Sequence, residues 1–97
     1  MQDEIKMDYP LMEEMKRTFQ SGREQLQDTM NELKSIADKM EQGALLGQAG
    51  SAFSDAIRGA LMGAVAKLSD KFEELEGDLQ HAVDQMHQAE EKAKASF

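Results

Sequence analysis

The sequence predicts an all-α protein: an antiparallel two-helix hairpin that pairs with a second hairpin into a four-helix bundle dimer. Apolar residues recur at alternating steps of three and four along both halves of the chain. A cluster of glycines separates the two halves, and the single proline stands near the amino terminus, where it does not interrupt a helix. With 97 residues, the chain is expected to form one domain over 1–97.

The first helix is expected over about 8–41, because the sequence contains both a helix-start signal and a regular apolar packing face. Asp8 can cap free backbone N–H groups, and Pro10 falls in the first turn, where its missing N–H does no harm. The a and d positions of the heptad pattern that follows are Met12, Met15, Phe19, Gly22, Leu26, Thr29, Leu33, Ile36 and Met40. Seven of these nine positions are apolar, which predicts one continuous packing face.

A turn is expected over about 42–48, where Gly43, Gly47 and Gly50 interrupt the pattern. The second helix is expected over about 49–96, since the apolar pattern resumes at Phe53 and continues to Ala89. Its members are Phe53, Ile57, Leu61, Val65, Leu68, Phe72, Leu75, Leu79, Ala82, Met86 and Ala89. A tight turn makes the two helices antiparallel neighbours.

The apolar stripes are wider than one helix–helix seam requires, because flanking positions such as Met30, Ala37, Ala56, Ala60 and Ala64 are also apolar. A second hairpin would cover this surplus surface, so a dimer is predicted. The residues predicted for the core and the dimer interface are Met12, Met15, Phe19, Leu26, Leu33, Ile36, Phe53, Ile57, Leu61, Leu68, Phe72, Leu75 and Leu79.

Composition disfavours several classes of function. The net charge of −8 argues against a nucleic-acid partner, which is also negative. The absence of cysteine excludes disulfides and thiolate metal sites. His81 and His87 are six residues apart and point to different faces of a helix, so they are not expected to bind one metal ion. No catalytic or phosphate-binding motif is present, which predicts a protein without enzyme activity or cofactor.

The segment 43–66 raises the question of a membrane function. It carries only two charged residues, Asp55 and Arg58, and Gly59 and Gly63 form a G-x-x-x-G pair. Each central charge costs roughly 2.5–3.5 kcal/mol on insertion, so no stable membrane insertion is expected. The small residues are instead expected to let helix backbones approach near the turn, with the charges facing water. A membrane-active helical pair is kept as an alternative of another class, and a cytosolic coiled-coil adaptor as a third.

Two segments carry further information: LLGQAGSAF (45–53) at the turn, and the set Met86, Glu90, Ala93 and Phe97 near the end. Both resemble segments of the WXG family of small helical hairpins exported by type VII secretion. LLGQAGSAF (45–53) is similar to the family's Trp-x-Gly turn, with Leu45 in the place of Trp and Gly47 matching the Gly. Near the end, Met86, Glu90, Ala93 and Phe97 resemble the broader form of the family's export signal, with Met86 in the place of Tyr. Eleven residues make about three helical turns, so the first and last members of this set share one face.

The resemblance implies a type VII secretion substrate or partner protein that acts by binding. It would be cytoplasmic before export and secreted without a cleavable signal peptide, in keeping with an acidic amino terminus that lacks an apolar run. Family hairpins pair head to tail, so the turn of one and the carboxyl-terminal helix of the other would together bind the secretion ATPase. A homodimer is the first expectation. The alternative is a heterodimer with a related hairpin or with the targeting domain of a Leu-x-Gly toxin, which the turn also resembles.

Overall fold

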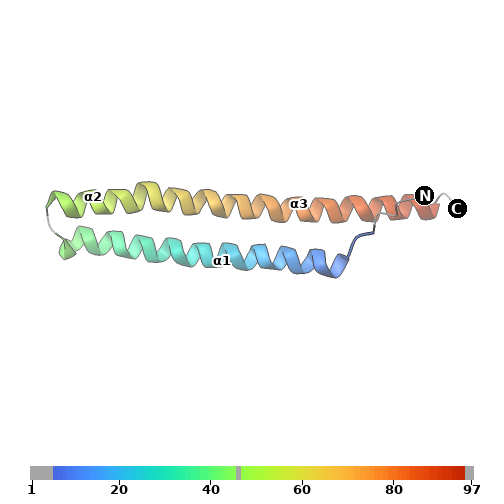
Figure 1. Ribbon diagram of the computed structural model, residues 1–97, viewed down its shortest axis with the longest axis horizontal. Coiled ribbons are helices and arrows are strands. Elements are labelled where there is room, and N and C mark those ends of the chain that lie inside the picture. Colours follow the sequence, from blue (N-terminus) through green and yellow to red (C-terminus); the bar gives the residue numbers. More distant parts are fainter. Residues whose placement is uncertain (1–5, 46, 96–97) are drawn as a thin grey trace.

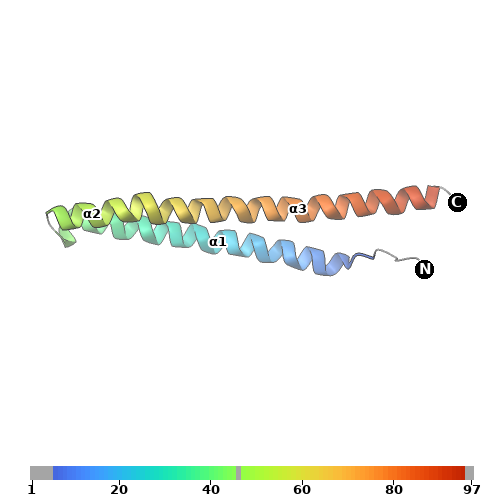
Figure 2. The ribbon, with the colours of Figure 1, turned by 45° about the horizontal axis from the view of Figure 1, so that its top comes forward.

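The protein folds into a rod made of two antiparallel helical arms (Figure 1). The computed structural model describes residues 6–45 and 47–95. The rod measures 75 × 22 × 18 Å, and the turn at one end leaves the two arms side by side along most of its length (Figures 1 and 2). The predicted all-α hairpin of two long antiparallel helices is therefore confirmed.

The first arm is helix α1 (Tyr9–Lys39), and it begins as the sequence predicts. The carboxylate of Asp8 accepts a hydrogen bond from the backbone N–H of Leu11 at 3.0 Å. Pro10 lies in the first turn, where its fixed φ suits a helix. The predicted cap is confirmed, and it fixes the point at which the helical backbone starts.

The second arm is a single long helix that contains one widened turn. It consists of α2 (Gln48–Ala56), the π-helical turn η2 (Ile57–Leu61) and α3 (Met62–Ala95). The arms are joined through η1 (Met40–Ala44), whose helical backbone is broken by a kink at Gly43, and a short link. Figure 2 shows that the end of α3 extends past the start of α1. Within residues 6–45 and 47–95, the part of α3 that follows Glu90 therefore has no neighbouring helix.

Aromatic packing joins the two arms midway along the rod. The rings of Phe19 and Phe72 meet edge to face, with centroids 5.5 Å apart. Gly22 makes room for this contact, because a Cβ atom there would stand 2.7 Å from the Phe72 ring. Gly59 and Gly63, in contrast, have no heavy atom within 4 Å of where a Cβ would stand. The close backbone approach expected at these two glycines is not made within the chain.

Polar contacts tie the arms together beside the aromatic pair. Glu76 of α3 accepts hydrogen bonds from Gln20 at 2.7 Å and from Arg23 at 3.1 Å. Lys16 also donates to Gln80. The heptad phase places these polar residues on one side of the hairpin and the Phe19–Phe72 contact toward the other. The hairpin thus has a polar side and an apolar side.

The apolar side is left open. Of the thirteen residues predicted for the core and interface, Ile57 is buried and six are half-buried between the arms, namely Met12, Phe19, Leu26, Leu33, Phe72 and Leu79. The remaining six are 40–51% exposed: Met15, Ile36, Phe53, Leu61, Leu68 and Leu75. Their heptad positions flank Phe19 on α1 and Phe72 on α3, so they lie along the same side of the hairpin. We call these six residues the open apolar face.

The π-helical turn η2 keeps this face continuous. Leu61, Leu68 and Leu75 follow one another at seven-residue spacing, whereas Phe53 precedes Leu61 by eight residues. A π turn accommodates one residue more than an α-helical turn. Because η2 lies between Phe53 and Leu61, the extra residue is absorbed there and Phe53 stays in line with the leucines.

Candidate functional site

The turn adopts backbone conformations that require glycine at two positions. Gly43 has φ 112° and ends the helix of the first arm. Gly47 has φ 85° and ψ −161°, a region that is essentially restricted to glycine. Leu45, with φ −140° and ψ 109°, is extended between them. The backbone conformation at Gly47, the residue directly before α2, therefore explains why the Leu-x-Gly motif has glycine there.

Gly50 allows the closest backbone approach in the turn. It is buried in the first turn of α2, and a Cβ atom on it would stand 1.7 Å from the carbonyl oxygen of Leu45. This distance is far inside van der Waals contact, so only glycine fits here. Leu45 itself is 44% exposed beside an open hollow of about 250 Å³ that Met40 and Ser51 also line.

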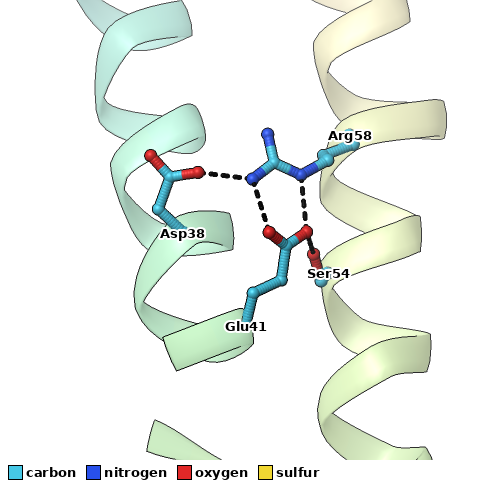
Figure 3. A network of polar contacts seen from close by, with 4 residues as sticks. All are labelled: Asp38, Glu41, Ser54 and Arg58. Carbon is cyan, nitrogen blue, oxygen red and sulfur yellow. Dashed lines mark hydrogen bonds and ion pairs between the residues drawn. The ribbon is translucent and has the colours of Figure 1, made fainter. Parts of the chain in front are cut away.

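A polar network fastens the two arms just above the turn (Figure 3). Arg58 of η2 donates through Nε and Nη2 to the two carboxylate oxygens of Glu41, at 2.8 and 3.1 Å. Its Nη2 also donates to Asp38 at the end of α1. The buried hydroxyl of Ser54 donates to Glu41 at 2.7 Å. Arg58 thus bridges α1 and η1 to the second arm, which corrects the expectation that it faces water.

The network shifts the ionisation of its members. Hydrogen bonds from Arg58 and then from Ser54 lower the pKa of Glu41 below its ordinary value of 4.5. Hydrogen bonds to Glu41 and then to Asp38 raise the pKa of Arg58. A carboxylate with a lowered pKa stabilises the fold fully above its unfolded pKa, and this contribution is lost as the pH falls through the folded value.

We therefore expect the stabilisation that Arg58 provides to weaken in acid. At pH 7 the variant Arg58→Met should unfold at a lower temperature than the wild type, because Glu41 and Asp38 lose their cation. Below a pH of about 4.5 the difference in Tm should begin to narrow, and it should be lost as the pH falls through the lowered pKa of Glu41 in the folded wild type. Thermal unfolding monitored by circular dichroism between pH 3 and 7 would measure the difference in Tm between the two proteins. Arg17→Met, at an exposed arginine outside the network, is the control, and a Tm difference for Arg58→Met that stays constant with pH would contradict the expectation.

The carboxyl-terminal segment meets the start of α1. Within the predicted export signal, Met86 is half-buried, and Glu90 and Ala93 are exposed. Phe97 lies outside the described residues. The Tyr9 hydroxyl donates to Glu90 Oε1 at 2.6 Å, and the Tyr9 ring stacks on the His87 ring with centroids 4.4 Å apart. This contact ties the start of one arm to the signal on the other.

The predicted turn and export residues lie at opposite ends of the rod. Leu45 and Gly47 are at the turn, whereas Met86, Glu90 and Ala93 are near the end of α3 (Figure 1). One hairpin does not bring them together. Head-to-tail pairing of two hairpins would place a turn from one subunit near the signal of the other.

The described residues also bear on metal and membrane sites. Over residues 6–45 and 47–95, no group of three or more His, Cys, Asp or Glu residues is arranged to hold a metal ion. In the same part of the chain, no helix is both long enough and apolar enough to cross a membrane.

Comparison with known families decides the classification. A family model described as "WXG100: Proteins of 100 residues with WXG" matches residues 4–91. The chain belongs to the WXG100 family. Neither a curated protein nor a solved structure matches it. WXG100 proteins are non-enzymatic proteins secreted by type VII systems, so the prediction that the chain is not an enzyme is confirmed.

The WXG100 match covers both arms and the turn, and the structure adds residues that sequence reasoning missed. The network of Asp38, Glu41, Ser54 and Arg58 was not predicted, although a lone arginine in a segment of small residues was a signal for it. The contact between Tyr9 and Glu90 has no local sequence signal, because 81 residues separate the two.

Proposed function

We propose that this chain is a type VII secretion substrate or partner protein that is exported as a folded pair of hairpins. One observation carries the proposal: a WXG100 hairpin leaves an apolar face open along its length, and the end of its second arm extends past the start of the first. The open face supports pairing, and the exposed side chains of Glu90 and Ala93 support recognition by the secretion ATPase.

The occupant proposed for the open apolar face is a second copy of the chain. On each arm its side chains follow a seven-residue spacing, with η2 absorbing the one extra residue between Phe53 and Leu61, which suits packing against another hairpin with the same pattern. A two-fold pair presents the same face from both subunits. The hairpins would pair head to tail, with the turn of each beside the carboxyl-terminal helix of the other.

A heterodimer is the second candidate, and one observation favours it. Leu45 stands where the family has tryptophan, and the Leu-x-Gly form resembles the targeting domains of Leu-x-Gly toxins. In this form the open apolar face would bind the helical domain of such a toxin. The export signal at Met86, Glu90, Ala93 and Phe97 would serve the complex in the same way.

The signal is tested by two single substitutions. Glu90→Ala and Phe97→Ala should each lower export by about tenfold, the effect of losing about 1.4 kcal/mol of binding to the ATPase. Helicity and dimerisation should change little, because Glu90 is exposed outside the packed seam. Secretion from the host strain, measured against the amount of protein inside the cell, is the readout.

Glu91→Ala is the matched control, since Glu91 is also exposed and stands one residue further along the same helix. Its face differs by about 100° from that of Glu90, so its loss should leave export unchanged. Normal export of Glu90→Ala and Phe97→Ala would count against the proposed signal.

A further inference from the structure

The best-defined cluster outside the turn lies where the start of α1 meets α3 at His87 and Glu90. Tyr9 donates its hydroxyl to Glu90 Oε1 at 2.6 Å, and its ring lies nearly parallel to that of His87, at 3° between planes. Glu90 Oε2 stands 3.9 Å from His87 Nδ1. Two different helices thus determine where the Glu90 carboxylate lies.

The cluster restrains Glu90 without covering it. The Glu90 side chain remains 46% exposed, and the Tyr9 hydroxyl donates to only one of the two carboxylate oxygens of Glu90. A long side chain that is free in solution loses rotamer freedom on binding, which weakens association. A carboxylate already held in one conformation avoids much of this loss.

We propose that Tyr9 is a positioning residue of the export signal: it holds the Glu90 carboxylate ready for a cationic group in the partner's groove, so that the recognised surface is built from both arms. This inference rests on the proposed function. It adds that α3 alone does not make the complete surface, because the hydroxyl comes from the first turn of α1.

The partner's chemistry follows from the cluster. An exposed carboxylate is recognised most strongly by an arginine or lysine through a charge-assisted hydrogen bond. The phenol hydroxyl is neutral, so it leaves the negative charge of Glu90 in place for such a group. The stacked rings of Tyr9 and His87 add a flat aromatic surface beside the carboxylate.

The test uses the full chain in its host and compares Tyr9→Phe, Glu90→Gln and the double variant. Tyr9→Phe removes the hydroxyl but keeps the ring on His87, so the hairpin should remain folded. We expect it to lower export about three- to tenfold, and we expect the double variant to export no less than Glu90→Gln alone, because Tyr9 acts through Glu90. Thr18→Val is the control, because it removes an α1 hydroxyl that bonds only within its own helix, to the Glu14 carbonyl.

A spectroscopic readout checks the contact independently of export. Tyr9 is the only tyrosine and the chain has no tryptophan, so the tyrosinate absorbance band reports on this phenol alone. Partial removal from water, followed by the hydrogen bond and charge of Glu90, raises the pKa of Tyr9 to about 12 from its ordinary 10.0. At pH 10.5, with helicity monitored, the wild-type phenol should be less ionised than that of Glu90→Gln.

The outcomes separate this inference from the proposed function. Reduced export of Glu90→Gln together with normal export of Tyr9→Phe would overturn the inference and leave the signal intact. Normal export of both would overturn the signal itself. Equal losses from Tyr9→Phe with and without Glu90→Gln, or a phenol that titrates alike in both proteins, would show that Tyr9 does not act through Glu90.

Discussion

In the proposed homodimer, Leu68→Glu should separate the pair into single hairpins. Leu68 is 46% exposed within one chain and lies in the middle of the open apolar face. Completing the burial of half a leucine is worth about 1 kcal/mol in each subunit, and an unpaired carboxylate in the interface costs more. The substitution occurs twice in a symmetric pair. We expect the dissociation constant to rise at least about a hundredfold, or about 3 kcal/mol.

Size-exclusion chromatography with light scattering measures this change directly. The chain has a mass of 10.8 kDa, so a pair and a single hairpin are well separated. Gln88→Glu is the control: it introduces the same carboxylate at an exposed position on the other side of the second arm. A wild-type protein that is a stable monomer would refute homodimer formation, and a Leu68→Glu dimer of unchanged affinity would refute this face as the interface.

Gly50→Ala should destabilise the hairpin more than any other alanine substitution of a glycine in the second arm. The added Cβ would stand 1.7 Å from the Leu45 carbonyl oxygen, so the backbone of the turn must move. Inserting a methyl group where there is no space costs roughly 1–3 kcal/mol, occasionally more. For a chain of this size the Tm should fall by about 10 °C. Thermal unfolding at a fixed protein concentration is the measurement.

Gly77→Ala is the matched control because the same methyl group enters open space. No heavy atom lies within 4 Å of a Cβ at Gly77, which is exposed in the middle of α3. Alanine is favoured over glycine in a helix by about 0.5–1 kcal/mol, so this variant should be more stable than the wild type. The same glycine-to-alanine substitution is thus expected to lower the Tm at position 50 and to raise it at position 77. A Gly50→Ala protein as stable as the wild type would show that the turn backbone relaxes freely.

The sequence predicted those features that depend on local rules. Heptad spacing predicted two long helices, the cluster of glycines predicted the turn, and Asp8 predicted the first cap. The glycines carry this information because Gly43 and Gly47 adopt positive φ, which other residues rarely do. Such constraints act within a few residues, so they can be read without knowing the fold.

Contacts between the arms were harder to predict because they depend on register. Tyr9 meets Glu90, and Arg58 meets Asp38, only because the turn sets how the arms align. The π turn η2, in contrast, does correspond to an irregularity in the apolar spacing of the sequence. Apolar steps alternate between three and four along most of the second arm, but three consecutive steps of four run from Phe53 to Val65. The extra residue that this implies lies where the structure has η2.

The slender shape of the hairpin sets a condition on the machinery that would carry it. Its cross-section is 22 × 18 Å while its length is 75 Å. Travelling end-on, a folded hairpin needs an opening little wider than one pair of helices, and two hairpins lying side by side need roughly twice that width in one direction. The diameter of the transport channel, and not the length of the protein, would then decide whether it passes as a single hairpin or as a pair.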